Sequence, residues 1–130
     1  MVCRMPPDFL ERIEIIEECY EFMLAYAAQG LPGDEGCRVG GQLRALLTQS
    51  VEALTGIAGS CGFLENEKGL AFLAVLDRDA RDSAAAIQLV LGQKSISSQL
   101  VDNLNASVHV RALLTDLFLL GECVRESTPQ

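Results

Sequence analysis

The fold class is indicated most clearly by residues 66–91, which read NEKGLAFLAVLDRDARDSAAAIQLVL. Apolar side chains recur every three or four positions here, which is the period of an amphipathic α-helix. They form a single stripe: Phe72, Leu73, Leu76, Ala80, Ala84, Ile87 and Leu91. The other faces carry two pairs of opposite charge at the i,i+4 spacing of a helix, namely Asp77 with Arg81 and Arg78 with Asp82. The stretch therefore predicts a helix.

Three further segments have the same period, and no stretch alternates as a strand does. Asp8 and Glu11 fit a capping box at the start of the first segment, and Gly30 follows its end. Four helices with mostly short connections predict an all-α fold, an antiparallel up-down-up-down four-helix bundle in one domain spanning residues 1–130. Leu76 and Leu104 are expected in its core. The four predicted helices cover residues 8–29, 41–58, 66–91 and 96–124.

The connection at residues 30–41 contains five glycines and precedes a predicted helix. Glycines before a helix N-terminus sometimes hold phosphate groups. However, no strand precedes this segment, the Gly-Lys-Ser/Thr motif is missing, and Asp34 and Glu35 would repel an anion. We therefore interpret it as a flexible connector, which a partner would be able to order.

The composition excludes several classes of function. Of 130 residues, 10 are Lys or Arg and 18 are Asp or Glu, which gives a net charge of -8. Nucleic-acid backbones and anionic lipids are bound by basic surfaces, so neither is an expected partner. Tryptophan is absent and aromatic residues make up 5% of the chain, which argues against stacking of bases or sugars. Because no apolar run reaches membrane-spanning length and no signal peptide is recognised, we expect a cytoplasmic protein.

The five cysteines, at positions 3, 19, 37, 61 and 123, form no Cys-x-x-Cys pair. An odd number without zinc-site spacing indicates free thiols. Cys19 and Cys123 fall in helical patterns and are expected to be buried, whereas Cys37 and Cys61 fall in glycine-rich segments and are expected to be more exposed. A redox-sensing or nucleophilic role for Cys37 or Cys61 is an alternative to this interpretation.

Two predicted helices have more apolar surface than a helix needs in order to pack one side against the core of a bundle. The first has two apolar stripes that together cover about 200° of its circumference, and the end of the fourth is apolar nearly all round. Large apolar patches on soluble proteins commonly mark contact surfaces, so we predict a homodimer. The alternative is a monomer in which the fourth helix is central. The predicted interface residues are Ile15, Cys19, Phe22, Tyr26, Leu113, Leu117 and Leu120.

The first helix also carries an acidic face, which suggests a protein partner with a basic surface. Arg12 lies instead within the apolar arc of this helix. It is expected either to extend its charged end to solvent or to pair with an acid across an interface. The acidic face consists of Glu11, Glu14, Glu17, Glu18 and Glu21.

A polar stripe on the fourth helix is the main candidate for chemistry. It includes Asp102, Asn105, Asp116 and His109, the only histidine. One interpretation is a small acid–base site or an interhelical ligand pocket, which would need a titratable group from a second helix. The other is a solvated helix face that happens to contain one histidine.

The sequence contains no recognisable catalytic or metal-binding constellation. Di-iron bundles use two Glu-x-x-His pairs, and one histidine cannot supply them. We expect no catalytic residue, no metal and no cofactor, although a weak Mg²⁺ or Ca²⁺ site among the acids is an alternative. The preferred hypothesis is an accessory protein that acts through protein contact, as an adaptor, assembly factor or chaperone-like factor. The alternative is a small-molecule-binding protein or enzyme anchored by His109 and nearby acids.

Overall fold

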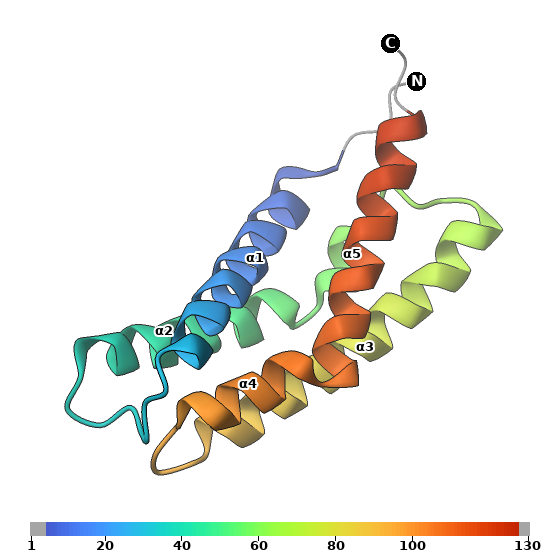
Figure 1. The fold of residues 1–130 in the computed structure, drawn as a ribbon. Helices are drawn as coiled ribbons and strands as arrows, with labels where there is room; N and C mark the ends of the chain where they lie inside the picture. Colours follow the sequence, from blue (N-terminus) through green and yellow to red (C-terminus); the bar gives the residue numbers. More distant parts are fainter. Residues whose placement is uncertain (1–4, 128–130) are drawn as a thin grey trace.

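The computed structural model describes residues 5–127, with side chains as far as Val124. Every regular element in this range is helical, which confirms the all-α prediction (Figure 1). The range contains five α-helices rather than the four expected. They are α1 (Pro7–Ala28), α2 (Arg38–Leu54), α3 (Glu67–Leu91), α4 (Ser98–Ala106) and α5 (Val108–Ser127), with a 3₁₀-helix, η1 (Ile57–Ser60), after α2.

The predicted capping box at the start of α1 is wrong. Pro6 occupies the N-cap position, and no side chain caps the helix there. Pro7 follows at the first helical position, which suits proline because the first N–H groups of a helix have no intrahelical partner. Asp8 lies inside the first turn, where its carboxylate accepts a hydrogen bond from Arg12 Nε at 3.1 Å. At the other end, Gly30 has the positive φ, +64°, that ends many helices.

Helix α2 begins earlier and ends earlier than residues 41–58. The Cys37 thiol caps its start by accepting a hydrogen bond from Gly40 N at 3.2 Å, so Gly40 and Gly41 lie in the first turn instead of preceding the helix. Gly40 is needed for space as well, because a Cβ there would collide with the carbonyl of Asp34. The helix ends at Leu54, and Gly56 then takes a φ of +75° before η1.

The fourth predicted helix, residues 96–124, is two helices in the structure. Ser107 has extended backbone angles, φ -62° and ψ 148°, and separates α4 from α5. Its hydroxyl oxygen accepts a hydrogen bond from Val110 N at 3.3 Å, in the manner of an N-cap. The chain changes direction there, so α4 packs against α1 whereas α5 packs against α3 (Figure 1).

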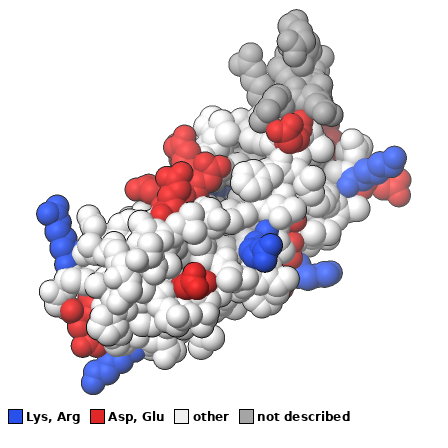
Figure 2. All heavy atoms as spheres, in the orientation of Figure 1, with Lys and Arg blue, Asp and Glu red and all other residues white. Residues whose placement is uncertain are grey.

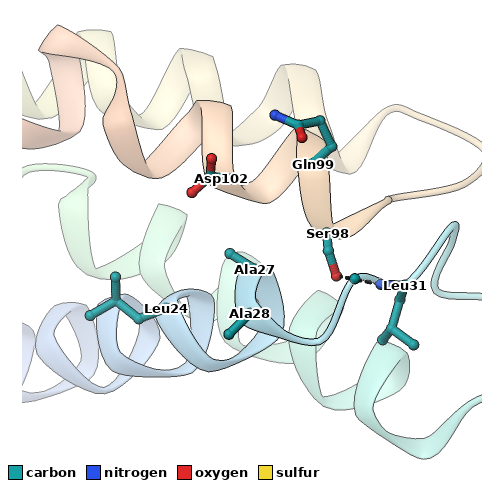
Figure 3. A pocket seen from close by; sticks show the side chains of 8 residues that line it. Leu24, Ala27, Ala28, Leu31, Ser98, Gln99 and Asp102 are labelled. Atoms are coloured by element: carbon teal, nitrogen blue, oxygen red, sulfur yellow. Dashed lines mark hydrogen bonds between the residues drawn. The ribbon is translucent and has the colours of Figure 1, made fainter.

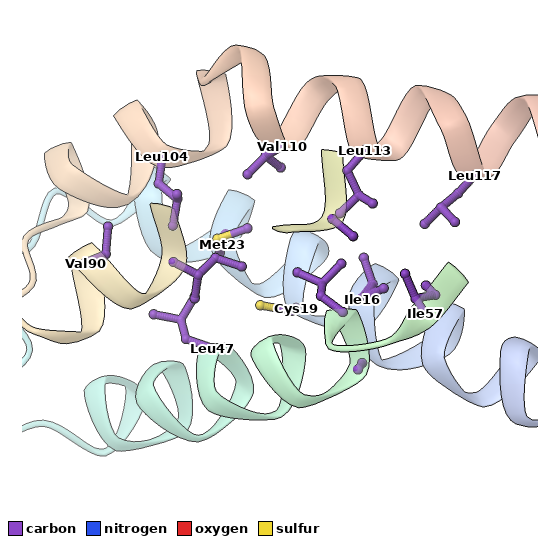
Figure 4. Close-up of a cluster of buried hydrophobic side chains, with 14 of the residues drawn as sticks. Ile16, Cys19, Met23, Leu47, Ile57, Val90, Leu104, Val110, Leu113 and Leu117 are labelled. Carbon is purple, nitrogen blue, oxygen red and sulfur yellow. The ribbon is translucent and has the colours of Figure 1, made fainter. Parts of the chain in front are cut away.

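One continuous apolar cluster fills the space between the helices (Figure 4). Leu76 and Leu104 belong to it and are buried, as predicted. Met23 and Ile16 reach it from α1, and Leu47 reaches it from α2. All five α-helices contribute, because each has an apolar face that must be removed from water.

The segment at residues 30–37 is attached to the helices by a buried carboxylate, which corrects our interpretation of it as a flexible connector. Asp34 is 7% exposed and pairs with Arg44 of α2. Its Oδ1 also accepts a hydrogen bond from Ile96 N at 2.7 Å. Hydrogen bonding from Arg44 is the main reason why the pKa of Asp34 is lowered. The loop is therefore joined both to α2 and to the segment that precedes α4.

Candidate functional site

Five of the seven predicted interface residues are buried inside a single chain. Ile15 and Phe22 are partly buried and pack against the same core. The wide apolar arc of α1 has a simple cause, because this helix packs against both α2 and α4. The five buried residues stabilise the chain's own fold and do not offer a surface to a second copy in this structure. The five fully buried residues are Cys19, Tyr26, Leu113, Leu117 and Leu120.

The predicted polar stripe is divided by the break at Ser107. Asp102 and Asn105 lie on α4, and His109 and Asp116 lie on α5. His109 is exposed, and its backbone carbonyl accepts a hydrogen bond from Ser83 Oγ at 2.8 Å. The structure therefore does not bring these four residues together into one acid–base site.

Asp116 is nevertheless an unusual carboxyl group. Its side chain points into the contact between α5 and α3, with 5% of the residue exposed. Its Oδ2 is buried and has no hydrogen-bond partner among the described residues. The pKa of Asp116 is raised to about 7, mainly by burial and further by hydrogen bonding and charge repulsion from Asp79 on α3. Burial and a neighbouring carboxyl group both favour the protonated form of Asp116.

A hollow lies between α1 and α4, and we call it the α1–α4 groove (Figure 3). It has a volume of about 500 Å³. The α1 side is apolar, and the α4 side is polar and includes the exposed carboxylate of Asp102. The residues that line it are Leu24, Ala27, Ala28, Gly30, Leu31, Ser98, Gln99 and Asp102.

The floor of the groove is fixed by Ser98 at the start of α4. Its hydroxyl donates to the carbonyl of Tyr26 at 2.6 Å and accepts from Leu31 N at 2.8 Å. The Tyr26 hydroxyl in turn donates to the carbonyl of Ile96 at 2.7 Å. These bonds, of which the two made by Tyr26 are buried, join the end of α1 to the start of α4, so the two walls of the groove are held at a fixed separation.

An acidic surface on α1 adjoins the groove. Figure 2 shows the acidic side chains gathered over this helix. All five glutamates of α1 are exposed, and Arg12 is the only basic residue in the helix. Arg12 donates hydrogen bonds to the carbonyls of Ala53 and Thr55, at 2.9 and 2.7 Å. Arg12 therefore caps the end of α2, which neither of our two interpretations of this residue anticipated. No other basic side chain within α1 balances the negative charge of the glutamates.

The cysteines differ from prediction in two places. Cys61 is buried and Cys123 is exposed, the reverse of the expectation for each, whereas Cys19 is buried and Cys37 is half-buried as expected. Burial raises the pKa of the Cys61 thiol to about 11 and also raises that of Cys19. A protonated, buried thiol is a poor nucleophile, so Cys61 has no support as a redox centre.

Among the described residues, no three His, Cys, Asp or Glu side chains come together in a way that would hold a metal ion. None of the helices in that range combines the length and apolar composition needed to span a bilayer. Comparison with models of protein families, with curated protein sequences and with solved structures finds no match to this chain.

Sequence reasoning missed Asp79 and the α1–α4 groove. Asp79 sits among alternating charges of a surface helix, and nothing in that pattern shows that it faces Asp116, which is far away in the sequence. The groove joins residues around Ala27 to residues around Gln99. Its existence depends on the break at Ser107, which turns α4 toward α1.

Proposed function

We propose that this protein acts through contact with a partner that presents a basic, amphipathic helical segment. An adaptor, assembly or chaperone-like accessory role fits this mode of action. The proposal places the protein in the cytoplasm as a single helical domain whose helices form an antiparallel bundle. It also includes a homodimer, because large apolar side chains remain exposed on the described surface, among them Leu89, Phe118 and Leu119.

One observation carries the proposal, namely that an apolar groove and a row of glutamates adjoin each other on α1. Glu14, Glu17 and Glu21 follow one another at spacings of three and four residues, and Leu24 of the groove wall continues the same row. A helical segment lying along this row would place apolar side chains in the groove and basic side chains beside the glutamates. Asp102 supplies a further negative charge on the opposite wall.

The alternative function, a small-molecule site anchored by His109 and nearby acids, has weaker support. His109 is exposed and does not line the α1–α4 groove. Asp102 does line it, but the nearest polar groups, Ser98 and Gln99, already make hydrogen bonds to Leu31, Tyr26 and Asn103. A wide groove with few uncommitted polar groups fits a peptide better than a small polar molecule.

The proposal is tested with a synthetic amphipathic helix of leucine and lysine, labelled for fluorescence anisotropy, and with a leucine–glutamate helix as the negative control. The wild-type protein is expected to bind the basic peptide, with affinity that falls as salt is added. Glu17→Lys combined with Glu21→Lys should weaken binding by about tenfold or more, which corresponds to about 1.4 kcal/mol.

The matched control combines Glu11→Lys with Glu18→Lys, which changes the net charge equally on another part of the same helix. If binding depends on the groove side of α1, this control should lose less than about threefold in affinity. Equal losses in the two double variants would show that the peptide responds only to net charge, and the proposal would then be wrong.

A further inference from the structure

The outward face of α3 is unusually apolar for an exposed helix. Solvent-facing helix surfaces are normally polar, yet five of the seven residues in this row are alanine, valine or leucine. Val75 is 41% exposed and Leu89 is 70% exposed. We call this row the outer stripe of α3, and it consists of Ala71, Ala74, Val75, Arg78, Asp82, Ala85 and Leu89, all exposed.

The two charges in the outer stripe have opposite signs and occupy its centre. Arg78 and Asp82 are four residues apart, yet the structure shows no ion pair between them among its described residues. The neighbouring pair, Asp77 and Arg81, does form, with Nε and Oδ2 2.9 Å apart. The difference agrees with the helix dipole, because an ion pair at this spacing is stronger when the acidic residue precedes the basic one than in the reverse order. Arg78 and Asp82 therefore remain available to an external partner.

We propose that the outer stripe of α3 is the contact surface of a two-fold symmetric homodimer, in which Arg78 of each copy pairs with Asp82 of the other. Two antiparallel copies of α3 can be aligned so that each arginine meets the other copy's aspartate, and the two-fold axis then makes this contact twice. The same alignment places Ala71 opposite Leu89 and Val75 opposite Ala85. A large side chain thus faces a small one at both levels, which allows close approach of the two helices.

This inference supplies the surface for the homodimer included in the proposed function, but it uses a different helix from the peptide contact. The paired region from Ala71 to Leu89 is about 27 Å long. A contact made mainly by one helix from each copy falls at the small end of specific interfaces, so we expect a dissociation constant of about 10 µM or weaker.

The test is sedimentation equilibrium on the whole chain over concentrations up to about 1 mM. The wild-type protein is expected to form a dimer. Arg78→Asp alone and Asp82→Arg alone should each weaken it by at least about tenfold, because each places like charges opposite one another. A 1:1 mixture of the two single variants should recover association, and so should the chain that carries both substitutions.

Arg38→Asp and Glu52→Arg on α2 serve as controls, since they make the same changes of charge at exposed positions outside the stripe. They should leave the dissociation constant within about twofold of the wild-type value. Circular dichroism checks that every variant is folded. A wild-type monomer over the whole range would overturn the inference, as would a dimer that persists in both single reversals or a mixture that fails to recover. None of these results would affect the peptide test on α1.

Discussion

Arg12 and Arg44 each complete the end of a helix that lies far away in the sequence. Arg12 of α1 donates to the carbonyls of Ala53 and Thr55 at the end of α2. Arg44 of α2 donates to the carbonyls of Leu91, Gln93 and Lys94 at the end of α3, over 3.0 to 3.3 Å. The last carbonyls of a helix have no intrahelical partner, so each arginine satisfies acceptors while joining two helices.

The aspartates that hold these arginines provide a matched comparison. Asp34 is buried, whereas the side chain of Asp8 is 62% exposed. We expect Asp34→Ala to reduce the free energy of unfolding by about 2–4 kcal/mol, because it leaves Arg44 and Ile96 N without their acceptor. Asp8→Ala should cost at most about 1 kcal/mol. Urea denaturation measures both, and equal costs would contradict the role assigned to Asp34.

The raised pKa of Asp116 predicts a specific dependence of stability on pH. Its value of about 7 in the folded protein exceeds that of an ordinary aspartate. The folded state therefore holds an extra proton between about pH 4 and pH 7, and the free energy of unfolding should decrease as the pH rises through this window. Above about pH 7 the contribution should level off.

Denaturation at about pH 5.5 and about pH 8 measures this effect. Asp116→Asn resembles the protonated acid in shape and cannot ionise, so it should remove most of the difference between the two pH values. Glu52→Gln, at an exposed position, should retain the wild-type difference. If Asp116→Asn retained it too, Asp116 would not be the group responsible.

The burial of the thiols predicts an order of reactivity. Cys123 is exposed, while Cys19 and Cys61 are buried with raised pKa values. A short pulse of maleimide on the native protein should therefore label Cys123 first and label Cys61 only after denaturation. Mass spectrometry of the digested protein identifies the labelled sites. Rapid labelling of Cys61 would show that its surroundings open readily. Cys3 lies outside the described residues.

At the scale of the elements, the separation of α4 from α5 has the largest effect on the fold. The two helices pack against different neighbours, so one straight helix would not satisfy both contacts. We expect Ser107→Ala to lower the free energy of unfolding by about 1 kcal/mol, as the loss of an N-cap does, although alanine favours helix. Thr115→Ala in the middle of α5 should be neutral or slightly stabilising. A more stable Ser107→Ala protein would mean that the break is not required.

The elements differ in how well the sequence predicted them, and the reason is physical. The bounds of α3 agree closely with prediction because Asn66 and Gly92, which flank it, are local signals. The start of α2 depends on a cysteine cap and on glycines inside its first turn, and neither is a usual start signal. The break at Ser107 has only a weak signal, since one serine in a long apolar pattern does not usually interrupt a helix.

At the scale of the whole molecule, the error in the predicted interface comes from counting apolar residues on one helix at a time. Tyr26 and Leu113 lie outside the single apolar stripe that a helix of a simple bundle needs. Both are nevertheless buried, because α1 and α5 each contact more than one neighbour. The acidic character of α1 needed no tertiary information, and its glutamates are exposed as expected. Predicting the groove beside these glutamates would have required tertiary information, because its two walls come from helices distant in the sequence.

The central claim is that a basic amphipathic segment binds along α1 and into the α1–α4 groove. Its most direct test is an NMR titration of the ¹⁵N-labelled protein with the leucine–lysine peptide. The account predicts that amide signals shift along one side of α1 and across the groove, including those of Glu17, Leu24, Ala28 and Asp102, while the outer stripe of α3 is unaffected. Shifts confined to other faces, or none at saturating peptide, would contradict it.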